Sequence, residues 1–341
     1  MKAARVVDGS LQVVDVPVPE PAREEALVRI TSAGVCHSDL HLARGDWAGV
    51  GQAGLLGHEA IGVVESLGDG ADRWARVGDR VILGLGGAGG GYWCGACHHC
   101  LSGNPRHCAE GKGIMGTFAE HFTVWARSLV VLPGSVGDLE APLACGGLTA
   151  FGAVRKLLTH GVRPGRPVAV VGAAGGLGHY AVQLCTNFGY DVVAVDRGPE
   201  RLEFTRSLGA TLALEPDQAV DAVQRWGGVD AALVFTANLA GFDLGFKMLA
   251  KAGLFVAVGL PPSSDGPFQI NPFELFFKDA TIIYSAVGTV QDMRELVDLA
   301  AAGKVHSHVD RTGTLSELDG IFDDLQKARY LGRAVITDLA N

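Results

Sequence analysis

The stretch from Pro167 to Asp196 constrains the fold of this chain more than any other. An apolar run, Pro167–Val171, leads directly into a glycine-rich loop, Gly172–Gly178. Apolar residues then recur at helical spacing, and a second apolar run, Asp191–Val195, ends at Asp196. Continuous apolar runs are typical of parallel strands that are covered on both faces. The order strand, loop, helix, strand therefore predicts a parallel sheet flanked by helices.

The loop itself has the composition of a turn that binds phosphate. Glycine permits a tight turn and a close approach of the backbone, so that a pyrophosphate can lie at the N-terminus of the following helix. Glycine also serves ordinary turns, so the loop alone is a weak signal, and the acid after the second strand strengthens it. A carboxylate there accepts hydrogen bonds from the adenosine ribose and repels a 2′-phosphate, which favours NAD over NADP. The adjacent arginine would soften this preference. The candidate cofactor contacts are Gly172, Gly175, Gly176, Leu177, Gly178, Asp196 and Arg197.

The same alternation continues beyond this unit. Apolar runs at 230–235, 254–258 and 281–286 read as strands, and the stretch 239–250 has a helical pattern. Strands that alternate with helices indicate a doubly wound parallel sheet. We therefore expect a dinucleotide-binding domain over residues 151–287.

Residues 1 to about 150 have a different pattern. Short β-branched runs are separated by Gly, Pro and Asp turns, which predicts a β-rich, barrel-like domain. These runs are Leu11–Val16, Ala26–Ile30, Ile61–Glu65 and Arg80–Leu83. A chain of 341 residues has room for about two such domains.

Four cysteines in this part have the spacing C-x2-C-x2-C-x7-C: Cys94, Cys97, Cys100 and Cys108. Three thiols at two-residue gaps can surround one tetrahedral ion, and the fourth closes the shell. A shell of four thiolates has no open position, so the site would be structural. Four thiolates also hold iron–sulfur clusters, and free thiols are a further alternative. Of the nearby imidazoles, only His107 is a weak alternative ligand.

A second set of metal ligands lies between Gly34 and Glu59. Cys and His are the usual zinc ligands, and catalytic zinc takes three protein ligands and keeps one position open. Cys36 and His58 would supply two of them, and Glu59 follows directly. Each of these residues alone could be a buried thiol or a surface polar group. A third ligand would have to come from elsewhere in the chain.

Net charge and composition limit the classes of partner that this chain can bind. The net charge is −9 and no Lys/Arg cluster occurs, which argues against nucleic acid or an anionic membrane as a partner. No apolar run reaches the roughly 18 residues that a membrane span needs. The N-terminus, Met1–Asp8, is too charged for a signal peptide, so we expect a cytoplasmic location. In a reducing compartment, seven cysteines read better as metal ligands than as disulfides.

Taken together, these motifs resemble those of one family. Gly34-Val35-Cys36-His37-Ser38-Asp39-Leu40-His41, Gly57-His58-Glu59 and the four-cysteine lobe resemble the zinc-dependent alcohol dehydrogenases of the medium-chain dehydrogenase/reductase superfamily, over essentially the whole chain. The resemblance implies a GroES-like catalytic domain, residues 1–150 completed by 288–341, and a Rossmann coenzyme domain over 151–287. It also implies two zinc ions per chain, NAD, an alcohol or aldehyde substrate, and a homodimer or homotetramer.

The resemblance further assigns residues. It makes Cys145 the third ligand of a catalytic zinc held by Cys36 and His58, with Glu59 beside the metal as an occasional or indirect ligand. From spacing alone, Cys145 would pass as a buried cysteine at a helix start. Ser38 would take the proton of the alcohol and pass it through the ribose hydroxyls to His41 at the surface.

Other family positions are matched less specifically. The resemblance places His37 near the pyrophosphate, Arg201 beside the adenosine ribose, Val258 at the nicotinamide carboxamide, Arg333 near the cofactor phosphates and Trp47 in the substrate pocket. The plainer interpretation of Arg201 is a solvated helix charge, that of Trp47 a structural aromatic, and that of Arg333 a charge on a surface strand. For the relay, Ser38 could be an ordinary loop hydroxyl and His41 a surface residue.

Other functions remain open at this point. A zinc-free quinone reductase of the same superfamily would lack both metal sites, and a non-catalytic zinc-stabilised binding protein would need no acid at Asp196. Within the zinc class, an aromatic alcohol, a polyol or a formaldehyde adduct are alternative substrates. The segment Ala48–Gly51 replaces the prolines of many bacterial relatives, which leaves the size of the pocket open.

Overall fold

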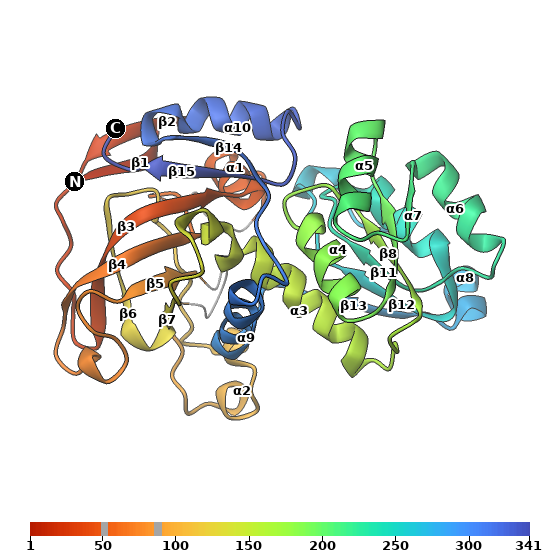
Figure 1. Cartoon of the computed structure of the whole chain (residues 1–341), viewed down its shortest axis with the longest axis horizontal. Helices are drawn as coiled ribbons and strands as arrows, with labels where there is room; N and C mark the ends of the chain where they lie inside the picture. Colours follow the sequence, from red (N-terminus) through yellow and green to blue (C-terminus); the bar gives the residue numbers. More distant parts are fainter. Residues whose placement is uncertain (49–53, 85–90) are drawn as a thin grey trace. The chain divides into compact units, whose positions relative to one another are not determined.

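The computed structural model describes residues 1–48, 54–84 and 91–341. Residues 49–51, which bear on the expected pocket size, lie outside this part. The chain forms two compact units, one of Met1–Leu148 with Val287–Asn341 and one of Thr149–Ala286. In Figure 1 the first unit is coloured red to yellow for its N-terminal part and blue for its C-terminal part, and the second unit is coloured green to light blue. None of the helices in the described part is long and apolar enough to cross a membrane.

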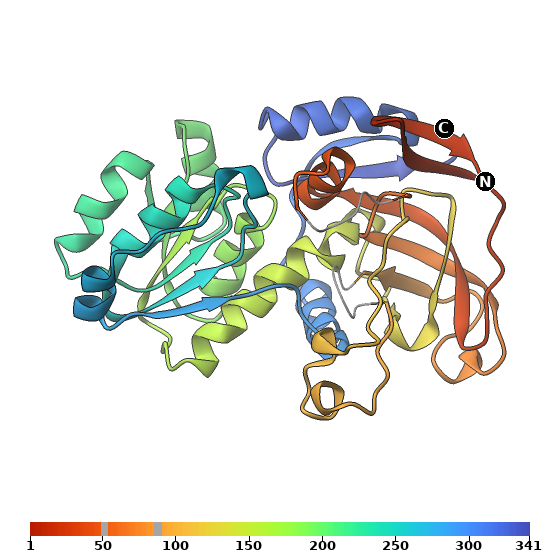
Figure 2. The same cartoon turned by 180° about the vertical axis from the view of Figure 1, so that it is seen from behind.

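The first unit is built on a mixed seven-stranded sheet. Its path is β14-β15-β3-β4-β5-β7, and β6 pairs with β3. The strands are β3 (Glu25–Val35), β4 (Ala60–Leu67), β5 (Arg80–Leu83), β6 (His121–Trp125), β7 (Val130–Val131), β14 (Val309–Thr314) and β15 (Arg333–Asp338), with a separate hairpin of β1 (Lys2–Val7) and β2 (Ser10–Asp15). The C-terminal strand β15 lies antiparallel beside β3, as Figure 1 and Figure 2 show from opposite sides. The last residues of the chain are thereby brought to the strand that leads into Cys36.

Short helices fill the connections of this unit. They are α1 (His37–Arg44), η1 (Ala71–Arg73), α2 (His98–Leu101), η2 (Pro105–His107), η3 (Ala126–Ser128), η4 (Asp138–Ala144), α9 (Val290–Ala301), η6 (Leu315–Glu317) and α10 (Leu318–Gln326), and α3 (Gly146–Thr159) continues into the second unit. The core lies between the sheet and α10, where apolar residues of β3 and β4 meet Ile321 and Phe322. Val28 and Ala60 are fully buried there, as the alternation of apolar residues predicts.

The second unit is a doubly wound parallel sheet of six strands in the order β10-β9-β8-β11-β12-β13. The strands are β8 (Pro167–Val171), β9 (Asp191–Val195), β10 (Leu212–Leu214), β11 (Val229–Val234), β12 (Leu249–Ala257) and β13 (Thr281–Tyr284). The helices are α4 (Gly178–Asn187), α5 (Pro199–Ser207), α6 (Pro216–Gln224), α7 (Leu239–Met248), η5 (Ser263–Asp265) and α8 (Pro272–Lys278). Helices cover both faces of this sheet (Figure 1 and Figure 2). The predicted fold class is confirmed.

The order of strands also fixes where a ligand can bind. The chain starts at β8, winds outward to β10, and returns past β8 to β11. The direction of winding therefore reverses between β8 and β11. In open sheets of this type, ligands bind outside the carboxyl ends of the strands at such a reversal. The glycine-rich loop follows β8 at this place.

Candidate active site

The expected catalytic zinc ligands lie together in the first unit. One ligand atom each from Cys36, His58, Glu59 and Cys145 lies within 4.8 Å of all the others. The first three side chains are almost fully buried. The antiparallel pairing of β3 and β4, with Ala33 opposite Ala60, brings the end of one strand to the start of the other. Cys145 joins them from the end of η4.

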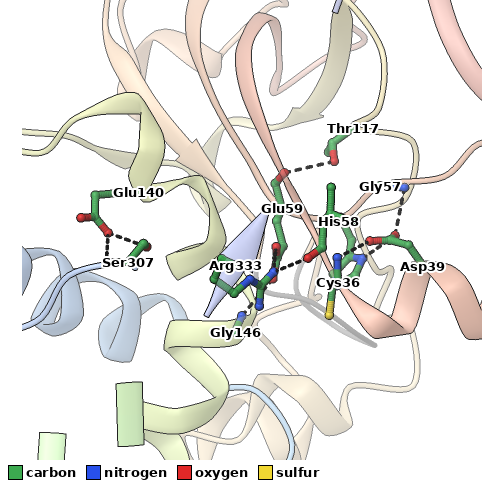
Figure 3. A network of polar contacts seen from close by, with 11 residues as sticks. Cys36, Asp39, Gly57, His58, Glu59, Thr117, Glu140, Gly146, Ser307 and Arg333 are labelled. Carbon is green, nitrogen blue, oxygen red and sulfur yellow. Dashed lines mark hydrogen bonds and ion pairs between the residues drawn. The ribbon is translucent and has the colours of Figure 1, made fainter. Parts of the chain in front are cut away.

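The buried carboxylate of Asp39 orients this cluster. Its oxygens accept hydrogen bonds from His58 Nδ1 at 2.8 Å, from the Gly57 amide at 3.1 Å and from the Cys36 amide at 3.3 Å (Figure 3). Histidines that bind metal usually donate their other ring N–H to such a carboxylate. His58 Nε2 is buried and has no hydrogen-bond partner within the described residues. Its lone pair is therefore available to a metal ion.

The charges of the cluster favour a cation. Burial opposes a charge on His58, but the Asp39 carboxylate and the Cys145 sulfur outweigh it, so the pKa of His58 is raised well above its ordinary value. A hydrogen bond with the Cys145 thiol and the neighbouring His58 hold the pKa of Cys36 well below the usual range of thiols, against the effect of burial. Thiolate and imidazole are zinc ligands, and the cluster attracts positive charge. The residues present fit a zinc ion.

Glu59 has a partner that the sequence did not reveal. Its Oε1 accepts a hydrogen bond from the Gly146 amide at 3.0 Å, and its Oε2 forms an ion pair with Arg333 Nη2 (Figure 3). The same guanidinium donates to the Val35 carbonyl at 3.0 Å. Burial raises the pKa of Glu59 to about 7, although Arg333 acts in the opposite direction.

One interpretation of Arg333 is therefore corrected. Its plainer interpretation was a charge on a surface strand, whereas only 2% of the residue is exposed. Its position near the cofactor phosphates, which the resemblance implies, stays a prediction. The reason for the burial is the pairing of β15 with β3, in which Ala334 lies opposite Val35. This register turns the preceding arginine toward Glu59, and the guanidinium is held inside the unit.

The four-cysteine lobe forms the second cluster. One sulfur each from Cys94, Cys97, Cys100 and Cys108 lies within 4.8 Å of the others. Backbone N–H groups of Ala96 and Cys97 lower the pKa of Cys94 to about 7, which favours its thiolate form. His107 is exposed and stands outside this group, so Cys108 is the fourth sulfur. The donor set matches a closed structural zinc site.

The residues expected in the proton relay all lie on or next to α1. Ser38 is half-buried, and the neighbouring His37, which was expected near the pyrophosphate, is exposed. His41, expected at the surface, has 12% of its side chain exposed, and its Nδ1 lies 2.8 Å from Asp46 Oδ2. Its ring lies 5.0 Å from that of Trp47, which is itself partly buried against the core of the unit.

In the second unit, the glycine-rich loop is closely packed. Gly172 has a φ of 80°, which favours glycine, and a Cβ on Gly178 would lie 2.0 Å from the Gly172 carbonyl oxygen. Gly175, Gly176 and Leu177 form the turn before α4. The loop therefore brings its backbone to the N-terminus of a helix, where phosphate binds well.

Asp196 ties this loop to the end of β9. Its Oδ2 accepts a hydrogen bond from the Ala174 amide at 2.8 Å, and its Oδ1 accepts one from the Arg197 amide at 2.9 Å. Arg201 Nη1 lies 3.7 Å from Oδ1. The Arg197 side chain is exposed. Directly after β12, the Val258 amide donates to the Val234 carbonyl at 3.0 Å.

Sequence reasoning missed one further residue beside this site, Asp46. Gly45 directly follows α1, whose last turn contains His41 and Arg44, and glycine is the usual residue after a helix end. This signal could have predicted that the chain folds back at Gly45. It could not have predicted that Asp46 binds His41.

Comparisons with known proteins agree with this geometry. Residues 22–134 match the family model of the alcohol dehydrogenase GroES-like domain, and residues 176–302 match that of zinc-binding dehydrogenases. An alcohol dehydrogenase of Geobacillus stearothermophilus is 38% identical over 98% of this chain and 99% of its own. The crystal structure of an alcohol dehydrogenase from Aeropyrum pernix superposes with a TM-score of 0.89 at 34% identity, covering 98% and 99% of the two chains.

A solved NAD-dependent alcohol dehydrogenase is similar as well, with a TM-score of 0.87 at 26% identity over 98% of this chain and 99% of that one. The similarity spans both units, and the two metal-ligand clusters lie in the unit that the GroES-like model matches. This chain therefore belongs to the zinc-dependent alcohol dehydrogenases.

Proposed function

We propose that this chain interconverts an alcohol and its aldehyde or ketone at a zinc ion held by Cys36, His58 and Cys145, with NAD as the hydride acceptor. The observation that carries the proposal is the buried cluster of two sulfurs and one imidazole whose Nε2 has no partner in the described part of the chain. A zinc ion held there would supply a Lewis acid that lowers the pKa of the alcohol hydroxyl, and bound NAD would supply the hydride acceptor.

The protein residues around the cluster hold ligands and move the proton. Asp39 fixes the tautomer of His58, because its carboxylate can only accept the Nδ1 proton. Glu59 is held by Arg333 and by the Gly146 amide, which keeps its carboxylate directed away from solvent. Ser38 takes the proton of the alcohol, and His41 receives it on the way to water. The four-cysteine lobe binds the second, structural zinc.

The substrate test is a panel of primary, secondary and aromatic alcohols and polyols, each assayed with NAD and with NADP. We expect turnover of at least one alcohol class, and we expect this turnover to be faster with NAD than with NADP. If no alcohol or aldehyde reacted with either cofactor while two zinc ions were bound, the proposed reaction would be wrong. We further propose that the protein acts in the cytoplasm, which is supported by seven cysteines that form no disulfide.

Replacing Asp196 by asparagine should weaken the preference for NAD. The amide oxygen can still accept the Ala174 N–H, so the loop keeps its anchor, but the negative charge toward the ribose is lost. We expect KM for NAD to rise about tenfold, since a hydrogen bond to a charged group contributes about 1.5–3 kcal/mol. The ratio of kcat/KM for NADP over NAD should also rise. Asp191→Asn, at the exposed start of the same strand, is the control. An unchanged cofactor ratio would remove Asp196 from this role.

We also propose that the chain forms a homo-oligomer through the edge of the second unit. β13 is the last strand of its sheet and pairs only with β12 in the described structure. Ile282 and Tyr284 on this strand are 40% and 49% exposed. The preceding α8 exposes about three quarters of Phe273 and Phe276. An exposed apolar edge strand pairs readily with a second copy of itself around a two-fold axis.

Disrupting this edge should therefore produce monomers. A Phe276→Asp, Ile282→Lys double variant places charges in the proposed interface. We expect light scattering after gel filtration to give a mass near that of one chain, 35.5 kDa, whereas the wild type gives a multiple of it. Val77→Asp is the control, because Val77 is a similarly exposed apolar residue, 64% exposed, of the first unit. If the double variant kept the mass of the wild type, the interface would lie elsewhere.

A further inference from the structure

We propose that Asp46 is the residue that positions His41 as the last proton acceptor of the reaction. The proposal rests on the relay from Ser38 to His41 given above, and it adds a residue that neither the sequence motifs nor the comparisons assign. It follows from how the chain turns after α1, from the tautomer that this turn imposes on His41, and from the surroundings of the ring.

The turn after α1 brings Asp46 back over the helix. Gly45 ends α1 with a φ of 70°, the left-handed region that glycine adopts readily. The next residue then donates its backbone N–H to the His41 carbonyl at 3.0 Å. The side chain of the same residue reaches the same histidine, with Asp46 Oδ2 2.8 Å from His41 Nδ1. Asp46 therefore holds His41 through both backbone and side chain.

The carboxylate selects one tautomer of the imidazole. An ionised carboxylate only accepts hydrogen bonds, so the proton of neutral His41 lies on Nδ1. Nε2 then carries the lone pair. This atom is buried and has no hydrogen-bond partner among residues 1–48, 54–84 and 91–341. A buried base with an unused lone pair is suited to receive a proton from a bound ligand.

The described neighbours of the ring are two aromatic rings and one carboxylate. The Trp47 ring lies 5.0 Å away and the His37 ring 6.2 Å away, centre to centre. On the same helix, Arg44 is directed to Gln326 of α10, with Nη2 2.6 Å from Oε1. Within the described part of the chain, Asp46 is the anion that contacts the ring. When a proton reaches Nε2, the imidazolium forms beside this carboxylate.

The proton balance follows from this arrangement. The O–H bond of the alcohol breaks, one proton passes through Ser38 and an N–H bond forms at His41 Nε2. The hydride leaves separately to NAD. The imidazolium then releases its proton to water, which restores the neutral tautomer with hydrogen on Nδ1. Asp46 neither gains nor loses a proton.

Asp46→Asn tests this role. Asparagine has nearly the same shape, but it has no charge and can donate to Nδ1, which allows the opposite tautomer. We expect kcat for alcohol oxidation at pH 7 to fall about tenfold, a part of the 10²–10⁴ that proton transfer contributes. Without the anion the imidazolium is less stable, so the pH at which kcat falls on the acid side should move to lower pH by about one unit. Asp46→Glu keeps the charge and should retain more activity than Asp46→Asn.

A readout besides activity is the ¹⁵N NMR spectrum of His41 in the zinc-loaded enzyme. It should show the Nδ1–H tautomer in the wild type and loss of that preference in Asp46→Asn. The matched control is Glu65→Gln, because Glu65 Oε2 lies 3.1 Å from His121 Nε2 in a histidine–carboxylate pair of the same unit away from the cluster. This variant should keep the pH profile of the wild type.

His41→Gln separates the two proposals. If this variant kept the pH profile of the wild type, the relay itself would be wrong. A second outcome is that His41→Gln removes the fall of kcat on the acid side (the acid limb), while Asp46→Asn leaves both this limb and the His41 tautomer unchanged. In that case the relay would stand and the role of Asp46 would be wrong. Loss of the limb in the first and its shift in the second support both.

Discussion

Replacing Cys145 by alanine is expected to reduce the zinc content from two ions per chain to one and to abolish alcohol oxidation. Cys145 supplies one of the two sulfurs of the catalytic cluster, and a zinc site with fewer than three protein ligands holds its metal weakly. Loss of the Lewis acid should lower kcat/KM about a thousandfold or more, since it contributes several kcal/mol to the transition state. Zinc is measured by mass spectrometry of the purified protein, and activity with the best alcohol of the panel.

The fold should survive this change, because the segment before Cys145 has anchors of its own. The Ser32 hydroxyl donates to the Asp138 carbonyl at 2.6 Å, and Arg80 Nη2 lies 2.5 Å from the Asp138 carboxylate. Glu140 accepts hydrogen bonds from both the amide and the hydroxyl of Ser307, at 2.9 and 2.6 Å (Figure 3). None of these contacts involves the metal ligands. The circular dichroism spectrum and the remaining zinc ion should therefore be retained.

Cys185→Ala is the matched control for Cys145→Ala. Cys185 is a fully buried thiol on α4, and burial raises its pKa, so it is an inert thiol of the core. This variant should keep two zinc ions and its activity. Activity in Cys145→Ala with one zinc ion per chain would show that Cys145 is not the third ligand.

The sequence predicted the second unit well because its signals are local. A covered parallel strand needs a continuous apolar run, and the predicted runs at 167–171 and 191–195 coincide with β8 and β9. The glycine at position 178 of the loop between them is also dictated by a local contact, because a Cβ there would overlap the Gly172 carbonyl. Here each residue type is dictated by neighbours only a few positions away.

The candidate site was only partly predictable, because its contacts join distant parts of the chain. Arg333 and Glu59 are 274 positions apart, and only the pairing of β15 with β3 brings them together. No periodicity or spacing contains that register. The resemblance placed His41 at the surface, but it could not predict that the turn at Gly45 brings Asp46 to its ring and places Trp47 beside it. Cys145 was found only through the family resemblance.

The buried pair of Arg333 and Glu59 should make Arg333→Met one of the most destabilising single substitutions in the first unit. The two side chains are 2% and 0% exposed, so removing the guanidinium leaves a carboxylate without a charge partner inside the protein. Breaking such a pair costs about 3–5 kcal/mol while the carboxylate stays ionised. Burial raises the pKa of Glu59 to about 7 even beside Arg333, so protonation of Glu59 relieves part of this cost at neutral pH and the full cost is measured at alkaline pH. For a unit of this size the expected decrease in Tm is on the order of 10 °C. Differential scanning calorimetry of the zinc-loaded protein measures it.

Two further variants test whether the loss of stability comes from breaking the buried ion pair or from removing an arginine of any kind. Arg329→Met removes a guanidinium that is 54% exposed and bound to Asp323 and Asp324, so it should cost less than about 1 kcal/mol. Glu59→Gln keeps an oxygen for the Gly146 amide but removes the charge that needs Arg333. In that background, Arg333→Met should therefore cost at least about 2 kcal/mol less than in the wild type. Equal costs in the two backgrounds would mean that Arg333 stabilises the unit through packing alone, because the penalty of an unpaired buried carboxylate exists only where that carboxylate is charged.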